Sequence, residues 1–222
     1  MKKTGVLIPS YNESKAIGGI VRELAAKGLS VCVIDDGSTD ETSAIAGDAG
    51  AFVIRHDRNK GKGASLRDGF AHILKKDFDA ALVLDGDGQH CICDVDKFFS
   101  KMDSAGADII IGNRMSDTSL MPVSRRLTNK FMSFLISKMC GHSIPDTQCG
   151  LRLIKNRVLR SVKLRSDNYE IESELLLKAA RQGFKIESVP IKTIYQDERS
   201  SINPVTDTVR FIAFLIRTML GR

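Results

Sequence analysis

The sequence contains no tryptophan and only three tyrosines among its 222 residues, and its lysines and arginines form no dense block. Nucleic-acid-binding proteins typically combine clustered basic residues with aromatic side chains that stack on bases. A basic nucleic-acid-binding module is therefore the weaker interpretation of the net charge of +6. The charge instead favours other anionic partners, such as nucleotides or phospholipids.

Long apolar runs are also lacking. No stretch reaches the roughly 18 apolar residues that are needed to cross a bilayer. The apolar segment at residues 6–8 is too short for the core of a signal peptide. We therefore expect a cytoplasmic protein. With 42% hydrophobic and 27% charged residues, the chain fits one domain with a substantial core.

The five cysteines are odd in number and include no Cys-x-x-Cys pair. Cys91 and Cys93 lie beside His90, but no second pair of zinc ligands follows, so a zinc site is disfavoured. Reduced thiols are the expectation for all five.

Short apolar segments alternate with helical patterns through the first half of the chain. We expect strands at residues 6–9, 31–34, 52–55, 81–84 and 109–111, and helices at 14–27, 39–49, 64–76 and 94–105. Such alternation is typical of βαβ units and predicts an α/β fold with a mostly parallel sheet flanked by helices. Polar clusters follow four strands, at the carboxyl ends where such sheets bind ligands.

The second half is less regular. We expect helices at 124–139 and 171–181, strands at 151–154 and 186–191, and a final amphipathic helix over 204–222 that begins with Asn203 and Pro204. Because no repeat or linker divides the sequence, we predict a single domain over residues 1–222.

The most informative motif is Asp85-Gly86-Asp87-Gly88-Gln89, directly after a predicted strand. Successive residues of a strand point to opposite faces, so the two carboxylates converge only if the chain bends, and glycine permits that bend. Mg²⁺ and Mn²⁺ prefer oxygen ligands and commonly bind one or two carboxylates together with substrate phosphates. The motif predicts a divalent cation that bridges a diphosphate.

Three further loops each have two interpretations. Tyr11 and Glu13 are placed to contact a nucleoside, whereas Asn12 or Ser14 alone would cap a helix. The adjacent aspartates at 35–36 can hold a base edge, with Ser38 or Thr39 as a cap. Residues 60–65 lack the spacing of a phosphate-binding P-loop, but their glycines can present backbone N–H groups to an anion; a plain turn is the alternative.

Together these segments resemble family-2 glycosyltransferases of the GT-A fold, most closely the dolichyl-phosphate mannose and glucose synthases. The matching blocks lie in order at residues 8–13, 34–40, 59–63, 85–90, 112–114, 146–152, 169–172 and 201–204. The resemblance implies a Rossmann-like domain and metal-dependent, inverting transfer of a hexose. The donor would be a nucleotide diphosphate sugar of the GDP-mannose or UDP-glucose type, and the acceptor a polyprenyl phosphate. Many relatives carry C-terminal membrane spans, and this sequence shows none.

The resemblance also implies residue roles. The nucleotide-sugar-binding residues would be Pro9, Tyr11, Glu13, Asp36, Lys62 and Asp85. The ligands of Mg²⁺ or Mn²⁺ would be Asp85, Asp87 and Gln89, with Asp87 the direct ligand. The catalytic residues would be Asp87 and three phosphate-binding arginines, Arg114, Arg126 and Arg199. Arg125 competes with Arg126 for its place in the match.

The acceptor decides which further groups are needed. A saccharide hydroxyl needs a general base, whereas a lipid phosphate is already anionic and needs cations that orient it. Arginines at 114, 125, 126 and 152 favour the lipid phosphate. Glutamates at 170, 172 and 174 keep the hydroxyl acceptor open, although a solvated helix face is the preferred interpretation of these three. A sugar nucleotidyltransferase would need a glycine-rich, arginine-containing loop after the first strand, which residues 9–13 do not provide.

The predicted C-terminal helix mixes apolar residues with arginines, a pattern typical of helices that lie in a lipid interface. Packing on the domain, or against a second copy in an oligomer, is the alternative. We expect peripheral contact with the cytoplasmic face of a membrane.

Overall fold

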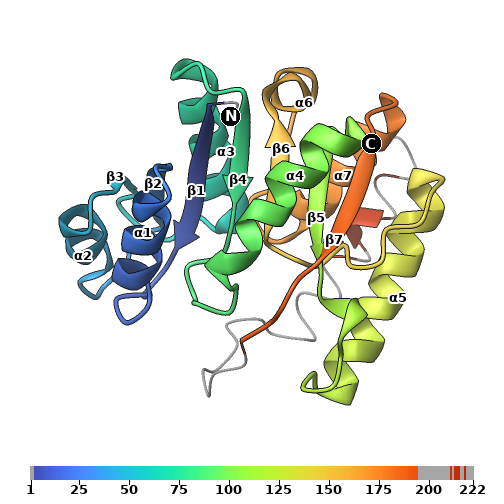
Figure 1. Ribbon diagram of the computed structural model, residues 1–222, viewed down its shortest axis with the longest axis horizontal. Coiled ribbons are helices and arrows are strands. Elements are labelled where there is room, and N and C mark those ends of the chain that lie inside the picture. The colour runs from blue at the N-terminus through green and yellow to red at the C-terminus, as the bar shows by residue number, and fades with distance from the viewer. Residues whose placement is uncertain (1–2, 195–210, 212, 216–217, 219–222) are drawn as a thin grey trace.

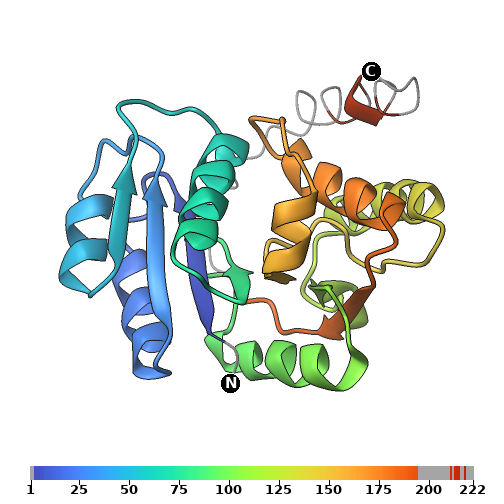
Figure 2. The ribbon, with the colours of Figure 1, turned by 90° about the horizontal axis from the view of Figure 1, so that it is seen from above.

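The computed structural model describes residues 3–194, 211, 213–215 and 218. Seven strands form one sheet in the order β3-β2-β1-β4-β6-β5-β7. Helices cover both faces of this sheet, as Figures 1 and 2 show, with α4 on one side and α3 and α7 on the other. The predicted α/β architecture with a mostly parallel sheet is confirmed.

The strands coincide with the apolar segments of the sequence. They are β1 (Thr4–Ser10), β2 (Ser30–Asp35), β3 (Phe52–Arg55), β4 (Ala80–Val83), β5 (Ile109–Asn113), β6 (Arg152–Lys155) and β7 (Ile186–Pro190). Every residue of β1 and β4 is buried, because helices cover both faces of the sheet centre.

The helices also follow the predicted pattern, with one addition. They are α1 (Ile17–Ala26), α2 (Thr42–Asp48), α3 (Lys62–Lys75), α4 (Val95–Ala105), α5 (Val123–Cys140), α6 (Asn156–Ser161) and α7 (Glu170–Arg181), together with the short 3₁₀ turns η1 (Ile92–Asp94) and η2 (Arg114–Ser116). Helix α6 was not predicted, because six residues are too few to show a helical period.

Strand β6 runs antiparallel between β4 and β5, which are not paired with each other. Arg152, its first residue, is in register with Val83 at the end of β4 and with Ile111 near the end of β5. The antiparallel direction therefore brings the loop before β6 to the carboxyl ends of its neighbours. If β6 ran parallel to β4 and β5, the loop before it would lie at the opposite edge of the sheet.

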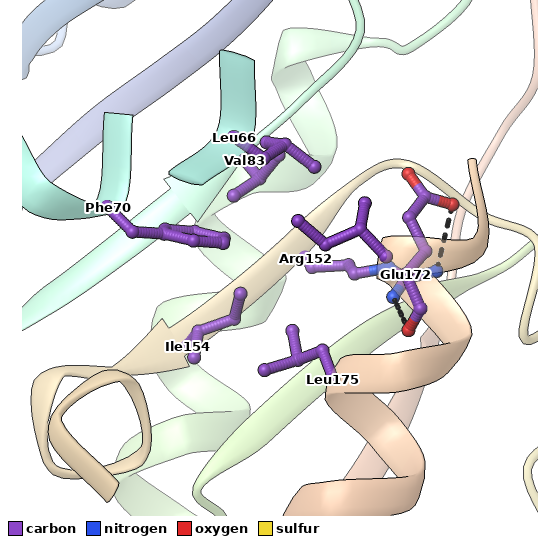
Figure 3. A pocket seen from close by; sticks show the side chains of 8 residues that line it. Leu66, Phe70, Val83, Arg152, Ile154, Glu172 and Leu175 are labelled. Atoms are coloured by element: carbon purple, nitrogen blue, oxygen red, sulfur yellow. Dashed lines mark hydrogen bonds and ion pairs between the residues drawn. The ribbon is translucent and has the colours of Figure 1, made fainter. Parts of the chain in front are cut away.

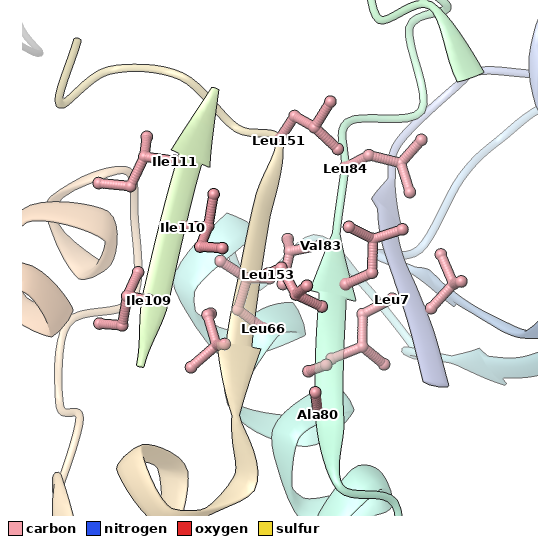
Figure 4. Close-up of a cluster of buried hydrophobic side chains, with 14 of the residues drawn as sticks. Leu7, Leu66, Ala80, Val83, Leu84, Ile109, Ile110, Ile111, Leu151 and Leu153 are labelled. Carbon is pink, nitrogen blue, oxygen red and sulfur yellow. The ribbon is translucent and has the colours of Figure 1, made fainter. Parts of the chain in front are cut away.

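The hydrophobic core lies on both sides of the sheet where β6 pairs with β4 and β5. Figure 4 shows Leu7, Leu84, Ile110, Leu151 and Leu153 pointing into one continuous cluster, and all five are at most 1% exposed. Burying such side chains supplies the main stabilisation, about 1.5–3 kcal/mol each.

Most of the predicted C-terminal helix lies outside the described residues, as do Arg199 and Pro204. Phe211 and Leu215, which are described, are helical and only 4% and 7% exposed within the core cluster. Within the described part of the chain, no helix combines the length and apolar character needed to cross a membrane.

The cysteines differ from expectation. Cys91 and Cys93 form a disulfide, so the prediction of a reduced thiol is wrong for these two. Their Cα atoms lie 5.2 Å apart in the turn after His90, within the range that a disulfide spans. Cys32, Cys140 and Cys149 are free. Burial raises the pKa of Cys32 and Cys149 to about 12 and that of Cys140 to about 11, so these thiols stay protonated.

Candidate active site

The loops that follow β1 and β2 are tied to each other by side chains. Asn12 adopts a left-handed conformation (φ 59°), and its side-chain oxygen accepts a hydrogen bond from the backbone of Thr39 at 2.8 Å. Its own backbone N–H donates to the Ser38 hydroxyl at 2.9 Å. The predicted caps are therefore wrong: neither α1 nor α2 has a side-chain cap, and these residues hold two site loops together.

Asp36, directly after β2, is buried and fixes the loop before α3. Its carboxylate accepts hydrogen bonds from the backbone of Lys60 and Gly61 at 2.9 and 2.8 Å, and lies 2.6 Å from His56 Nδ1. The predicted role of Asp36 in nucleoside binding remains a prediction, with a structural role now established beside it.

Gly61 and Gly63 allow the start of α3 to approach the backbone around Asp167 closely. The N–H groups of Gly63 and Ala64 donate to the Asp167 carbonyl at 2.7 and 3.2 Å. A Cβ atom at either glycine would collide with the backbone around Asp167. The first turn of α3 therefore binds a neighbouring loop, and the interpretation of its backbone as an anion cradle is wrong.

Lys62, between these glycines, reaches into the site. Its ammonium lies 2.6 Å from Asp85 Oδ1 and 2.7 Å from Glu172 Oε1. Burial lowers the lysine pKa, but the two carboxylates outweigh burial and hold the pKa above its ordinary value. Lys62 is thus a permanent cation that joins the motif after β4 to helix α7.

The surroundings of the two motif aspartates shift their pKa values in opposite directions. Burial opposes ionisation of Asp85, but Lys62 and His90 outweigh it, so the pKa of Asp85 lies well below its usual range. Burial and the charge of Asp85 both raise the pKa of Asp87. Asp87 carries a negative charge that its surroundings do not balance, which a divalent cation would correct.

This donor set suits a hard cation bound together with a phosphate ligand. Asp85 and Asp87 offer carboxylate oxygens and Gln89 an amide oxygen; the backbone N–H of Gln89 already donates to Asp87 at 3.0 Å. Among the described residues, no group of three or more histidine, cysteine, aspartate and glutamate side chains is arranged to hold a metal ion. Mg²⁺ and Mn²⁺ sites commonly complete their coordination with substrate phosphates and water.

Arg114, just after β5, is held by a residue that the sequence did not single out. Asp146 is fully buried and receives bidentate hydrogen bonds from Arg114 Nε at 2.7 Å and Nη2 at 2.9 Å. Burial lowers the pKa of Arg114, but Asp146 and Asp85 outweigh it and raise the pKa above its ordinary value. Asp146 lies in a matched sequence block, but the sequence carried no signal for this pairing.

Arg152 is not placed to contact a phosphate, contrary to prediction. It is 2% exposed and donates to the carbonyl oxygens of Thr147, Cys149 and Glu172, and to the Glu172 carboxylate at 3.1 Å. Figure 3 shows this pair, with the apolar side chains of Leu66, Phe70, Val83, Ile154 and Leu175 lining the same pocket. Arg152 is a structural residue that anchors α7 to β6.

The preferred interpretation of the α7 glutamates as a solvated face is also wrong. Glu172 and Glu174 are 8% and 5% exposed. Glu174 accepts hydrogen bonds from the backbone of Arg165 and Ser166 and from Lys178. Both carboxylates are held by cations and N–H donors, whereas Glu170 is half-buried.

The remaining predicted residues occupy varied positions. Pro9 is buried in β1, Tyr11 is 44% exposed, and Glu13 lies beside Gly86 of the motif. The structure thus brings the first loop, Lys62 and the aspartate pair to one edge of the sheet. Arg126 lies half-buried on α5, outside the ion-pair network among the described residues, and Arg199 lies outside those residues.

Comparisons with known proteins identify relatives in sequence and in fold. An uncharacterized protein of Methanocaldococcus jannaschii is 37% identical over 198 residues, covering 86% of this chain and 82% of that protein. UDP-N-acetylglucosamine–dolichyl-phosphate N-acetylglucosaminyltransferase of Methanococcus voltae is 29% identical and covers 86% of each chain. The solved structure of Mycobacterium tuberculosis glucosyl-3-phosphoglycerate synthase with Mn²⁺ and UDP-glucose shares the fold, with a TM-score of 0.73 at 19% identity, over 99% of this chain and 78% of that one.

The family model described as Glycosyl transferase family 2 matches residues 5–163. That span contains β1 except for its first residue, β2 to β6, and both aspartates of the motif. Since the match covers well over half of the sequence, this chain belongs to glycosyl transferase family 2 and is a glycosyltransferase.

Proposed function

We propose that this enzyme transfers a hexosyl group, with inversion and in a metal-dependent reaction, from a nucleotide diphosphate sugar to a polyprenyl phosphate. The observation that carries the proposal is the ion pairing of the glutamates on α7. Glu172 and Glu174 are the candidate general bases, and both form ion pairs with lysine or arginine side chains. An anionic phosphate acceptor needs no base. The similarity to a dolichyl-phosphate glycosyltransferase supports the same acceptor class.

In this proposal the donor lies at the carboxyl ends of β1, β2 and β4. Pro9, Tyr11, Glu13 and Asp36 would contact the nucleoside. Asp85, Asp87 and Gln89 would hold Mg²⁺ or Mn²⁺, which neutralises charge on the leaving diphosphate when bound. Lys62 keeps Asp85 ionised and fixes its orientation.

The acceptor phosphate would be oriented by arginines. Asp146 engages Nε and Nη2 of Arg114 and thereby fixes the plane of the guanidinium, whose Nη1 is directed elsewhere. An oxygen of the lipid phosphate forms the new bond to the anomeric carbon as the bond to the diphosphate oxygen breaks, and no proton is transferred. Arg126 and Arg199 are proposed to add further positive charge.

The runner-up is transfer to a saccharide hydroxyl with Glu172 as base. Glu172 would have to exchange its contacts with Lys62 and Arg152 for a proton. This need makes the hydroxyl acceptor the weaker proposal.

The test measures the product directly. Radiolabelled GDP-mannose and UDP-glucose are incubated with the enzyme, Mn²⁺ and either a short polyprenyl phosphate or a panel of saccharides. We expect label in the organic phase with the lipid, loss of transfer in Arg114→Ala, and retained transfer in Glu172→Gln. Transfer to a saccharide alone, abolished by Glu172→Gln, would establish the runner-up.

A further inference from the structure

Helix α5 packs on the core through Ile136, which is fully buried, and through the half-buried Met132, Leu135 and Met139. Its buried positions include the polar residues Asn129 and Ser133, at 7% and 4% exposed. Other large apolar side chains, on α5 and just before it, point outward. Leu120, Val123, Leu127, Phe131 and Phe134, which we term the α5 stripe, are 59–73% exposed. Surface helices normally turn their apolar side to the core, so this arrangement requires an explanation outside the core.

The exposed apolar side chains form one continuous line. At about 100° per residue, the four helical members of the α5 stripe fall within an arc of about 80°. Lys130 and Lys138, both exposed, lie in or beside the same arc. The stripe is thus a defined face rather than scattered surface residues.

The charged side chains of the segment that carries the stripe have one sign. Residues 118–145 include Arg125, Arg126, Lys130 and Lys138 but no aspartate or glutamate. Anionic lipid headgroups attract basic residues at a membrane surface, while apolar side chains enter the acyl boundary. A combined apolar and basic face complements such a surface on both counts.

We propose that the α5 stripe docks the protein on the surface of an anionic lipid bilayer. A second copy of this chain fits the face less well. In a twofold contact the same patch meets itself, so Lys130 and Lys138 would oppose the same lysines of the other copy without an acidic partner in the segment.

The inward side of α5 connects this surface to the site. Ser133 Oγ accepts from the backbone of Thr147 at 2.9 Å, and Ser137 Oγ accepts from that of Ile144 at 2.9 Å. The segment between them contains Asp146, which orients Arg114. Docking through α5 would therefore set the position of Arg114 relative to the bilayer; only this consequence rests on the proposed function.

The test is sedimentation of the full chain with vesicles of phosphatidylglycerol and phosphatidylcholine that contain no polyprenyl phosphate. Each positive charge removed should weaken anionic-vesicle binding about 5-fold, so Lys130→Gln/Lys138→Gln should cost about 25-fold. Phe131→Ser/Phe134→Ser should weaken it by at least about 10-fold. Both variants should keep the wild-type Tm and nucleotide diphosphate binding.

A matched control lies at the opposite end of the long axis, where Figure 1 shows β3. Phe52 is 55% exposed there, and Phe52→Ser should bind vesicles as the unaltered protein does. The proposal is overturned if the unaltered protein ignores anionic vesicles, if stripe and control variants behave alike, or if the stripe variants convert a dimer to monomers in sedimentation velocity. Retained vesicle binding without sugar transfer would contradict the proposed function and leave the docking surface intact.

Discussion

Asp87 and Asp85 are separated by one residue but differ in what surrounds them. Asp85 is neutralised within the protein by Lys62. For Asp87, burial and the neighbouring charge of Asp85 outweigh the backbone N–H of Gln89 and the more weakly acting His90 and Lys62. The unbalanced carboxylate is the one that gains most from a divalent cation. This difference supports Asp87 as the direct metal ligand.

Asp87→Asn should therefore abolish the Mn²⁺-dependent rise in Tm that a nucleotide diphosphate produces, because ligand binding stabilises the folded state. Its Tm without ligand should stay the same or rise, since the repulsion from Asp85 is removed. Thermal unfolding with UDP or GDP, with and without Mn²⁺, measures both effects. Asp117→Asn, at an exposed loop, serves as the control; a full ligand-induced shift in Asp87→Asn would contradict the assignment.

Lys62, unlike Asp87, has its charge balanced within the protein, because its ammonium pairs with the carboxylates of Asp85 and Glu172. Lys62→Met should lower the free energy of unfolding by about 3–5 kcal/mol, the usual cost of leaving buried charges unpaired. Urea denaturation measures the change. Lys60→Met is the matched control two residues away. Lys60 is more exposed, and among the described residues its ammonium forms an ion pair with the exposed Asp57, so a change below about 1 kcal/mol is expected. Equal effects of the two substitutions would show that Lys62 does not hold the site together.

At the scale of elements, the sequence predicted the apolar strands and the long helices well, because their period and length are local properties. The loops at the ends of β1, β2 and β4 were correctly placed at one edge, because strands that alternate with helices run parallel and their carboxyl ends meet at the same edge. The Arg114–Asp146 and Arg152–Glu172 pairs were not predictable, since each joins residues far apart in the sequence. The glutamates of α7 were misjudged because a charged residue buried by a distant partner looks the same in sequence as a solvated one.

Glu174 links α7 to the loop before it and makes that connection sensitive to pH. Burial opposes its ionisation, but hydrogen bonds from Lys178, Ser166 and Arg165 outweigh burial and lower the pKa below 4.5. Because the folded-state pKa lies below the unfolded one, the stabilisation is present above about pH 4.5 and is lost as pH falls through the folded-state pKa.

Glu174→Gln should accordingly cost about 2–3 kcal/mol of unfolding free energy at pH 7, and the difference from the unaltered protein should shrink below pH 4.5. Urea titrations between pH 3 and pH 7 measure this trend. Glu23→Gln, on an exposed turn of α1, should show neither effect. A cost that stays constant down to pH 3 would rule out ionisation of Glu174 as its origin.

At the scale of the whole molecule, the described part of the C-terminal segment belongs to the core. Phe211 and Leu215 are buried, and Arg181 donates to the Thr218 carbonyl at 3.2 Å. These contacts favour a structural role for this segment over the membrane contact expected from its sequence, while α5 carries the exposed apolar face.

Leu215→Ala should reduce the free energy of unfolding by about 2–4 kcal/mol through lost burial and the remaining cavity. Leu127→Ala, at a position 61% exposed, should change it by less than about 0.5 kcal/mol. Chemical denaturation of both variants provides the comparison. A Leu215 variant as stable as Leu127→Ala would mean that the segment is not part of the folded core.

The position of β6 has a consequence for how the chain folds as it leaves the ribosome. Strand β4 is complete early in synthesis, but its partner on one side is not made until Arg152–Lys155 has emerged. During that interval β4 presents an open edge of unpaired backbone groups, which is a template for pairing with another chain. The sheet can close only by a contact between distant parts of the sequence, which is a slow step in folding. Strand β6, which follows the Asp146 segment of the site, thus also covers the open edge of β4. Its pairing ends the period in which the nascent chain can pair with another chain.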